Sequence, residues 1–206
     1  MKKLIQGIVQ FRETRRAALT ETFAKLALGQ HPDALFIACS DSRMAVNVFA
    51  STEPGDLFVL RNVGNLVPPY EHPGSAGTAA AVDFAVEQLG VRDIIVCGHS
   101  DCGAMRAHCA GHETLDDGPL KTWLDMGATG NAAGLDPSEA SRLNVLEQLK
   151  HLGRYPSVRR AIEERGLRLH GLWFDIHPLD VLYHEPEEAA WTVLDSASAP
   201  RILSRL

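Results

Sequence analysis

The sequence predicts an α/β fold in which helices flank a central, mainly parallel β-sheet. Short apolar runs at residues 34–38, 57–60 and 93–97 have the length of buried strands. Segments with helical periodicity alternate with these runs, which is typical of a parallel sheet. Two of the strands end directly in reactive side chains, at residues 39–43 and 98–103. In such sheets, ligands bind beyond the carboxyl ends of the strands.

The composition is that of one globular domain. A chain of 206 residues with 45% hydrophobic content can build a full core. We expect a helical arm over about residues 1–30, an α/β core over about 31–184 and a tail over about 185–206. The net charge of −6 argues against nucleic acid and anionic membranes as partners. No apolar run reaches about 18 residues and no signal-peptide pattern is present, so we expect no membrane association and a cytoplasmic location.

Glycine and proline divide the first half of the chain into elements. Helical periodicity runs over residues 2–28 and ends at Gly29. The buried strand 34–38 follows, and the strand 57–60 begins after a Pro-Gly turn. A loop rich in glycine, asparagine and proline then leads to a helix over 75–89. We expect the hydroxyl of its first residue to cap that helix.

The second half continues the alternation of strands and helices. The third buried strand, 93–97, leads to a helix that starts near Cys102. Residues 110–136 are rich in Gly, Asp and Asn and predict an excursion with a short helix near Trp123. The remaining predicted elements are helices over 138–152 and 157–165, a strand over 168–175, a strand over 179–183 that pairs with it, and a partly helical tail from residue 187.

The stretch IIVCGHSDCGAM, residues 94–105, allows three chemical interpretations. Ser100 could be a hydrolase nucleophile, but Cys102 stands where the nucleophile elbow requires glycine. Cys102 could itself be a nucleophile beside His99. The third interpretation is that this stretch supplies half of a metal site. The two residues between His99 and Cys102 allow both side chains to point at one shared ion.

A second cluster favours the metal interpretation. Cys39 also follows a buried strand, in a loop expected at the same edge of the sheet. Together with His99 and Cys102 it gives three ligands that suit zinc, and catalytic zinc keeps three protein ligands and one open position. Cys97 and Cys109 are interpreted as small buried hydrophobes.

Asp41 and Arg43 lie two and four residues beyond Cys39. The simpler interpretation is a surface ion pair of little energetic value. We favour a carboxylate beside the metal that is held by a guanidinium fork. Bound to Arg43, Asp41 would stay off the metal and could accept a hydrogen bond from metal-bound water. Released from Arg43, it could become the fourth ligand and close the site.

The chain resembles the β-class carbonic anhydrases over about residues 1–184. The matching stretches are residues 39–43 (CSDSR), 53–59 (EPGDLFV), 61–65 (RNVGN), 98–103 (GHSDCG), and Gly77 with Thr78. The combination of the first and fourth stretches at this separation is highly specific. We expect Gly98 and Gly103, the first and last residues of the fourth stretch, to permit a tight strand-to-helix turn.

The resemblance implies one Zn²⁺ per subunit on Cys39, His99 and Cys102, with Asp41 and Arg43 as a catalytic pair. It implies reversible hydration of CO2 to bicarbonate and a proton, carried out by a hydroxide that zinc generates from water. Asp41 would be a zinc ligand only in a closed form. The resemblance also implies a homodimer as the minimal unit, which can assemble to a homotetramer, with the N-terminal helix packed on the neighbouring subunit.

CO2 requires a small apolar pocket, and we expect Val63, Val67 and Phe84 to line it. Phe84 matches an aromatic position in the family. One branch of the family binds bicarbonate in a regulatory pocket that uses a tryptophan and a valine. Here Phe36 and Met44 stand at those positions, so we expect no such pocket and an open metal site.

Two alternative functions are compatible with the same residues. A carbon disulfide or carbonyl sulfide hydrolase would use the same zinc site with a narrower access route. A non-catalytic zinc-binding or bicarbonate-binding module would bind without turnover. The Asp–Arg pair and the count of only three clear ligands argue against this second alternative.

Overall fold

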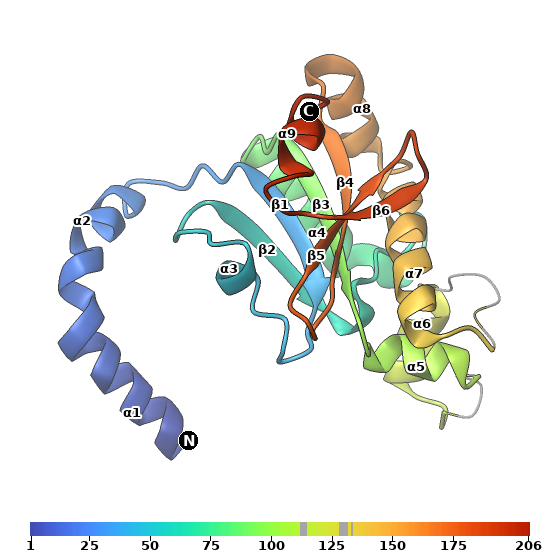
Figure 1. Ribbon diagram of the computed structural model, residues 1–206, viewed down its shortest axis with the longest axis horizontal. Helices are drawn as coiled ribbons and strands as arrows, with labels where there is room; N and C mark the ends of the chain where they lie inside the picture. The colour runs from blue at the N-terminus through green and yellow to red at the C-terminus, as the bar shows by residue number, and fades with distance from the viewer. Residues whose placement is uncertain (112–114, 128–131, 133) are drawn as a thin grey trace.

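The computed structural model describes residues 1–111, 115–127, 132 and 134–206. A six-stranded sheet with the order β2-β1-β3-β4-β5-β6 forms its centre (Figure 1). The strands are β1 Ala34–Cys39, β2 Leu57–Asn62, β3 Asp93–His99, β4 Arg168–Phe174, β5 Val181–Glu185 and β6 Ala190–Val193. The first four strands along the chain are parallel, whereas β5 and β6 pair in antiparallel fashion. The prediction of a mainly parallel sheet flanked by helices is confirmed.

Helices connect the parallel strands and cover the sheet (Figure 1). The α-helices of the described residues are α1 Lys2–Gln10, α2 Arg16–Leu26, α3 Val46–Phe49, α4 Ala76–Asp83, α5 Gly103–Cys109, α6 Pro119–Met126, α7 Pro137–Leu152, α8 Pro156–Arg165 and α9 Ala199–Leu203. A π-helical segment, Phe11–Arg15, joins α1 to α2, and another, Phe84–Gln88, extends α4. Within the described part of the chain, no helix is long and apolar enough to span a bilayer.

The N-terminal arm, formed by α1, α2 and the π-helical segment between them, extends away from the sheet (Figure 1). None of its helical residues is buried. The apolar side chains of Leu4, Ile8 and Phe11 are 60%, 59% and 43% exposed. The predicted helix over 2–28 is therefore present, but its apolar face has no cover within this chain.

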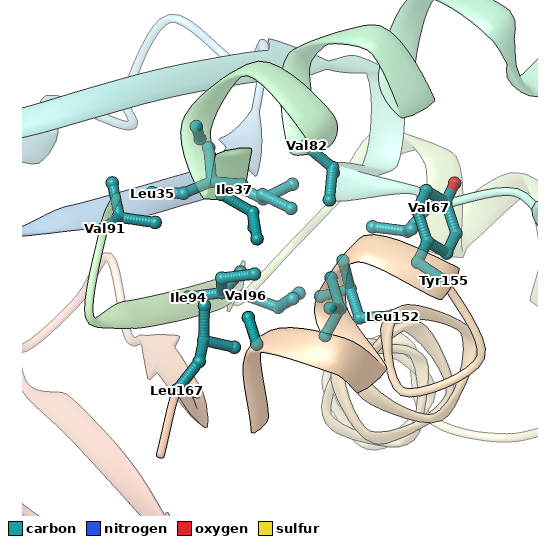
Figure 2. Packing of buried hydrophobic residues seen from close by; sticks show 14 of the residues in the cluster. Leu35, Ile37, Val67, Val82, Val91, Ile94, Val96, Leu152, Tyr155 and Leu167 are labelled. Carbon is teal, nitrogen blue, oxygen red and sulfur yellow. The ribbon is translucent and has the colours of Figure 1, made fainter. Parts of the chain in front are cut away.

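The two faces of the sheet carry two separate apolar clusters. All six residues of β1 are buried, because Leu35 and Ile37 belong to one cluster and Phe36 and Ala38 to the other. Figure 2 shows the first cluster, in which Leu35 and Ile37 lie among side chains from α4, β3 and α7. A strand covered on both faces reads as a continuous apolar run, which is why the sequence predicted it correctly.

The structure adds to and corrects several sequence expectations. Ser75 stands at the start of α4, but its hydroxyl donates to the carbonyl of Tyr70 at 2.9 Å instead of capping the helix. Strand β3 continues to His99, two residues further than predicted. Helix α3 and strand β6 were not predicted, since four residues are too few to show a period. The predicted excursion over 110–136 includes the residues outside the described part of the chain.

Candidate metal centre

Cys39, His99 and Cys102 meet at the carboxyl edge of the sheet. Cys39 is the last residue of β1, and His99 is the last residue of its parallel neighbour β3. Cys102 immediately precedes α5. One ligand atom from each residue lies within 4.8 Å of the other two, and all three side chains are buried. The fold therefore brings the two sequence clusters together, as expected, and their ligand atoms are close enough to bind a single ion.

The turn between His99 and Cys102 depends on Asp101 rather than on glycine. Asp101 has a φ of +54°, and Asp is one of the few residues with a side chain that enters this left-handed region readily. Gly103 has ordinary backbone angles and open space around it. Gly98 is needed for packing, because a Cβ there would lie 2.8 Å from a methyl group of Val145. The expectation that both glycines permit the turn was wrong.

The ring of His99 presents a bare nitrogen to the two sulfur atoms. Nδ1 lies 2.8 Å from the carbonyl oxygen of Ser100, to which it donates in the tautomer protonated at Nδ1. Nε2 is buried and has no hydrogen-bond partner. A buried nitrogen without a partner is costly unless an ion completes it. Imidazole oriented by a backbone carbonyl is also the usual arrangement of a metal ligand.

The surroundings of the Cys39 sulfur favour its thiolate form. The backbone N–H groups of Asp41 and Gly64 each donate to it at 3.4 Å. The neighbouring Cys102 thiol and these donors lower the pKa of Cys39 to about 4, against the effect of burial. The same proximity, together with burial, raises the pKa of Cys102. Two sulfur atoms that compete for a proton suit a borderline cation such as Zn²⁺, which replaces the protons of both.

Asp41 is held by Arg43 beside this centre. Nε of Arg43 donates to Oδ1 at 2.9 Å and Nη2 donates to Oδ2 at 2.7 Å. This bidentate pairing holds the pKa of Asp41 well below its usual range. Oδ2 of Asp41 lies 4.0 Å from Nε2 of His99. The carboxylate is therefore next to the donor set and is turned toward the guanidinium.

Arg61 holds the backbone of this loop, a function that the sequence did not reveal. Its guanidinium donates to the carbonyl of Cys39 at 3.1 and 3.0 Å and to the carbonyl of Asp41 at 2.7 Å. It reaches them from β2, the strand next to β1. The signal was present in the matching stretch RNVGN, but a charged residue in an edge strand is more often a solvated side chain.

A polar stripe on α7 holds the loop that follows β2. Asn144, Gln148 and His151, one or two helical turns apart, contact backbone groups of Gly64 and Val67 at 2.7–3.0 Å. All three side chains are buried. Gly64 is the residue whose N–H donates to Cys39, so this stripe supports the metal centre from a distance. In the sequence, the signal for this stripe was the recurrence of polar residues at helical spacing within the predicted helix over 138–152.

A cavity of about 480 Å³ opens on the centre. It is lined by Cys39, Ser40, Asp41, Val63, Gly103, Ala104, Ala107, Leu115, Leu120 and Leu124. Val63, one of the three residues expected at the substrate pocket, is among these lining residues. Val67 and Phe84 are not among the described residues that line this cavity. Val67 is fully buried in the core cluster of Figure 2, and Phe84 is 43% exposed and packs against Phe58.

The nucleophile interpretations find no support in this geometry. The hydroxyl of Ser100 accepts the N–H of Ile176 at 2.9 Å, and the His99 ring contacts the carbonyl of Ser100 rather than its hydroxyl. Cys102, the candidate cysteine nucleophile, is fully buried, and the neighbouring Cys39 together with burial raises its pKa. The metal interpretation is the one that uses the buried nitrogen and both sulfur atoms.

The chain is similar to known proteins over most of its length. A family model described as "Carbonic anhydrase" matches residues 34–180. The carbonic anhydrase of Pseudomonas aeruginosa is 45% identical over 186 residues, which are 85% of this chain and 84% of that protein. Carbonic anhydrase 1 of Escherichia coli O157:H7 is 43% identical over the same shares of the two chains.

Solved structures show the same similarity. The β-carbonic anhydrase CcaA superposes with a TM-score of 0.84 at 35% identity, over 95% of this chain and 92% of that one. A structure described among two tetrameric β-carbonic anhydrases of Sordaria macrospora gives a TM-score of 0.73 at 31% identity, over 88% of this chain and 95% of that one.

Proposed function

This chain belongs to the β-class carbonic anhydrase family, and from that membership we propose that it hydrates CO2 reversibly with Zn²⁺ held by Cys39, His99 and Cys102. The observation that carries the proposal is the bare, buried Nε2 of His99 facing two sulfur atoms. Two thiolates and an imidazole form a donor set that suits zinc. Among the described residues, no fourth His, Cys, Asp or Glu completes this group. Three protein ligands are typical of a catalytic site.

When bound, zinc supplies Lewis-acid chemistry that makes water a nucleophile at moderate pH. The residues of the chain supply orientation and proton transfer. Asp41 offers a carboxylate oxygen beside the ligands and can orient the attacking group or accept its proton. Arg43 keeps that carboxylate ionised and turned away from the ligand atoms. Arg61 fixes the backbone on which both Cys39 and Asp41 are carried.

The cavity suits a small apolar substrate. Val63 and three leucines, Leu115, Leu120 and Leu124, line it beside Asp41. CO2 carries no charge and requires no clamp, so an apolar wall beside the nucleophile is sufficient. An apolar wall would also accept carbon disulfide or carbonyl sulfide, which are linear molecules of the same kind.

The test is a stopped-flow assay of CO2 hydration on zinc-loaded protein, with carbon disulfide hydrolysis measured in parallel. We expect CO2 hydration that rises from about pH 6 to about pH 9, because two thiolates offset the charge of zinc and weaken its effect on water. A chelator should abolish the activity. Turnover of carbon disulfide alone would favour the hydrolase alternative, and zinc binding without turnover would favour a non-catalytic module. A flat pH profile would contradict the argument about the thiolates.

We also propose that the working unit is a homodimer, or a tetramer of two such dimers, in the cytoplasm. The oligomer is supported by the uncovered apolar face of the N-terminal arm, which includes Leu4 and Ile8, and by the description of the Sordaria enzymes as tetrameric. Ile8→Glu should shift the protein toward monomer in sedimentation experiments, because it would place a charge in the face that the proposed dimer buries. Gln6→Glu, which adds the same charge at a polar position of α1, is the control. An unchanged mass for Ile8→Glu would contradict the proposal.

A further inference from the structure

The Arg43 guanidinium pairs with two carboxylates rather than one. Besides its two bonds to Asp41, it donates through Nη1 to Oδ2 of Asp101 at 3.0 Å and through Nη2 to the carbonyl of Asp101 at 3.1 Å. The other carboxylate oxygen of Asp101 accepts from Nη1 of Arg106 at 2.8 Å. Arg106 lies on α5, the helix that follows Cys102. The four side chains form a chain of ion pairs in the order Asp41, Arg43, Asp101, Arg106.

We propose that Asp101 is a positioning residue for the reaction, which fixes the Arg43 guanidinium against Asp41 and so keeps the Asp41 carboxylate away from the metal. Arg106 supports it by holding the opposite side of the Asp101 carboxylate. The inference rests on the proposed function, because it assigns Asp101 to the same metal centre.

The restraint matters because Asp41 is close enough to change partner. Its Oδ2 lies 4.0 Å from Nε2 of His99, the atom that faces the two sulfur atoms. A side-chain rotation of Asp41 would therefore bring a carboxylate oxygen to the vacant fourth position of a three-ligand site. What opposes that rotation is the pair of bonds from Arg43.

The Asp41–Arg43 pair is bidentate, but its guanidinium is partly open to water. The Arg43 side chain is 40% exposed, and solvent weakens the hold of an exposed charge on its partner. A second anchor reduces the freedom that Arg43 has to leave Asp41. Exposed charges gain strength when they form a network with good geometry, which is the arrangement here.

The backbone of Asp101 explains why the anchor is well placed. Asp101 lies in the turn between the ligands His99 and Cys102, with a φ of +54°. The same turn therefore sets the positions of two ligands and of the carboxylate that holds Arg43. A merely structural alternative is that Asp101 stabilises the turn and the start of α5.

The experiment separates these two possibilities with variants that tolerate the turn. Asp101→Asn removes the charge, and Asp101→Gly removes the side chain; both residues accept a positive φ. Arg106→Gln removes the support behind Asp101. Asp33→Asn is the matched control, because Asp33 forms an exposed ion pair with Arg92 at 2.8 Å, near the opposite ends of the strands. If one of these variants fails to fold, the remaining variants still test the proposed role of Asp101.

The readout is the visible spectrum of the Co²⁺-substituted proteins at pH 8, titrated with thiocyanate. In the Asp101 variants Asp41 should compete for the metal, which raises the apparent Kd of thiocyanate about 3- to 10-fold. Arg106→Gln should show a smaller rise, and Asp33→Asn none. In an Asp41→Ala background the effect of Asp101→Asn should disappear, because the competing ligand is absent.

Two results would overturn the inference: Asp101 variants that bind thiocyanate as the wild type does, or an effect of equal size in the Asp41→Ala background. The second result would mean that Asp101 acts on the turn itself. Failure of the proposed function would look different. It would appear as wild-type protein that binds metal and thiocyanate yet does not hydrate CO2, and the titrations would still decide on Asp101.

Discussion

Asn144 donates its side-chain amide to the carbonyl of Gly64 at 3.0 Å, and the N–H of Gly64 in turn donates to the sulfur of Cys39 at 3.4 Å. A buried residue of α7 thus supports a proposed metal ligand through one shared neighbour. The φ of Gly64 is +82°, and a Cβ there would lie 2.9 Å from the Cβ of Ala104. Any residue with a side chain at this position would therefore meet both an unfavourable φ and the Cβ of Ala104.

Asn144→Ala should therefore destabilise both the fold and the metal centre. Its amide also accepts from Gln148 at 2.9 Å, so the change leaves buried polar groups without partners. We expect a loss of about 1–3 kcal/mol in the free energy of unfolding, measured by urea denaturation of the metal-free protein, and weaker retention of zinc. Asn47→Ala removes an exposed amide that donates to Thr52 and should cost much less. Equal losses in the two variants would contradict this account of α7.

Replacing a ligand sulfur should remove the metal without unfolding the chain. Cys39→Ser should lose zinc during dialysis against a weak chelator, because a serine hydroxyl is a poor substitute for a thiolate. Cys109→Ser changes a half-buried cysteine outside the donor set and should retain one zinc per chain. Metal analysis of the dialysed proteins, with circular dichroism as the check on folding, decides the matter. Zinc retained by Cys39→Ser would exclude this donor set.

Asp41→Asn should retain zinc and lose activity. The amide cannot accept a proton as the carboxylate does, and it loses the charge that Arg43 holds. We expect kcat for CO2 hydration to fall about 100-fold or more. Ser42→Ala, at an exposed position in the same loop, should keep kcat near that of the wild type. If Asp41→Asn is as active as Ser42→Ala, Asp41 has no part in the chemistry.

Glu185 predicts a specific pH dependence of stability. It is buried and accepts hydrogen bonds from Arg201, Arg205 and Thr192. Arg201, then Thr192, lowers the pKa of Glu185 from its ordinary value of 4.5 to about 2. Because the folded state holds the lower pKa, its contribution is fully present above about pH 4.5 and is lost as the pH falls toward 2.

Glu185→Gln should accordingly be less stable than the wild type at neutral pH, and the difference should shrink between about pH 4.5 and about pH 2. The measurement is urea unfolding of metal-free protein across that range, since acid also releases metal. Glu188→Gln is the control, because Glu188 contacts the same two arginines from an exposed position. Parallel stability curves for Glu185→Gln and the wild type would refute the assignment.

The sheet and the donor set could be predicted because their signals are local or carried by topology. The apolar run of β1 and the cluster after it place Cys39, and the rule for parallel strands places it beside His99. The sequence could not show that Val67 and Phe84 are absent from the described residues that line the cavity. Side-chain direction in a loop or on a helix depends on packing, which leaves no period in the sequence.

Long-range polar contacts were missed for a related reason. Arg61 and Gln148 each act on backbone groups more than 20 positions away, and nothing in the sequence names those partners. Asp101 illustrates the same limit: its charge was visible, but its two arginine partners come from a different loop and from α5. Propensity and periodicity describe elements, whereas these contacts depend on how the elements pack.

The most direct test of the central claim is a titration of metal-free protein with Zn²⁺ in which bound zinc and CO2 hydration are measured on the same samples. We predict that activity rises in proportion to bound zinc, stops rising at one ion per chain, and is absent from Cys39→Ser at every zinc concentration. Activity that is present before zinc is added, or that persists in Cys39→Ser, would contradict a zinc centre on Cys39, His99 and Cys102.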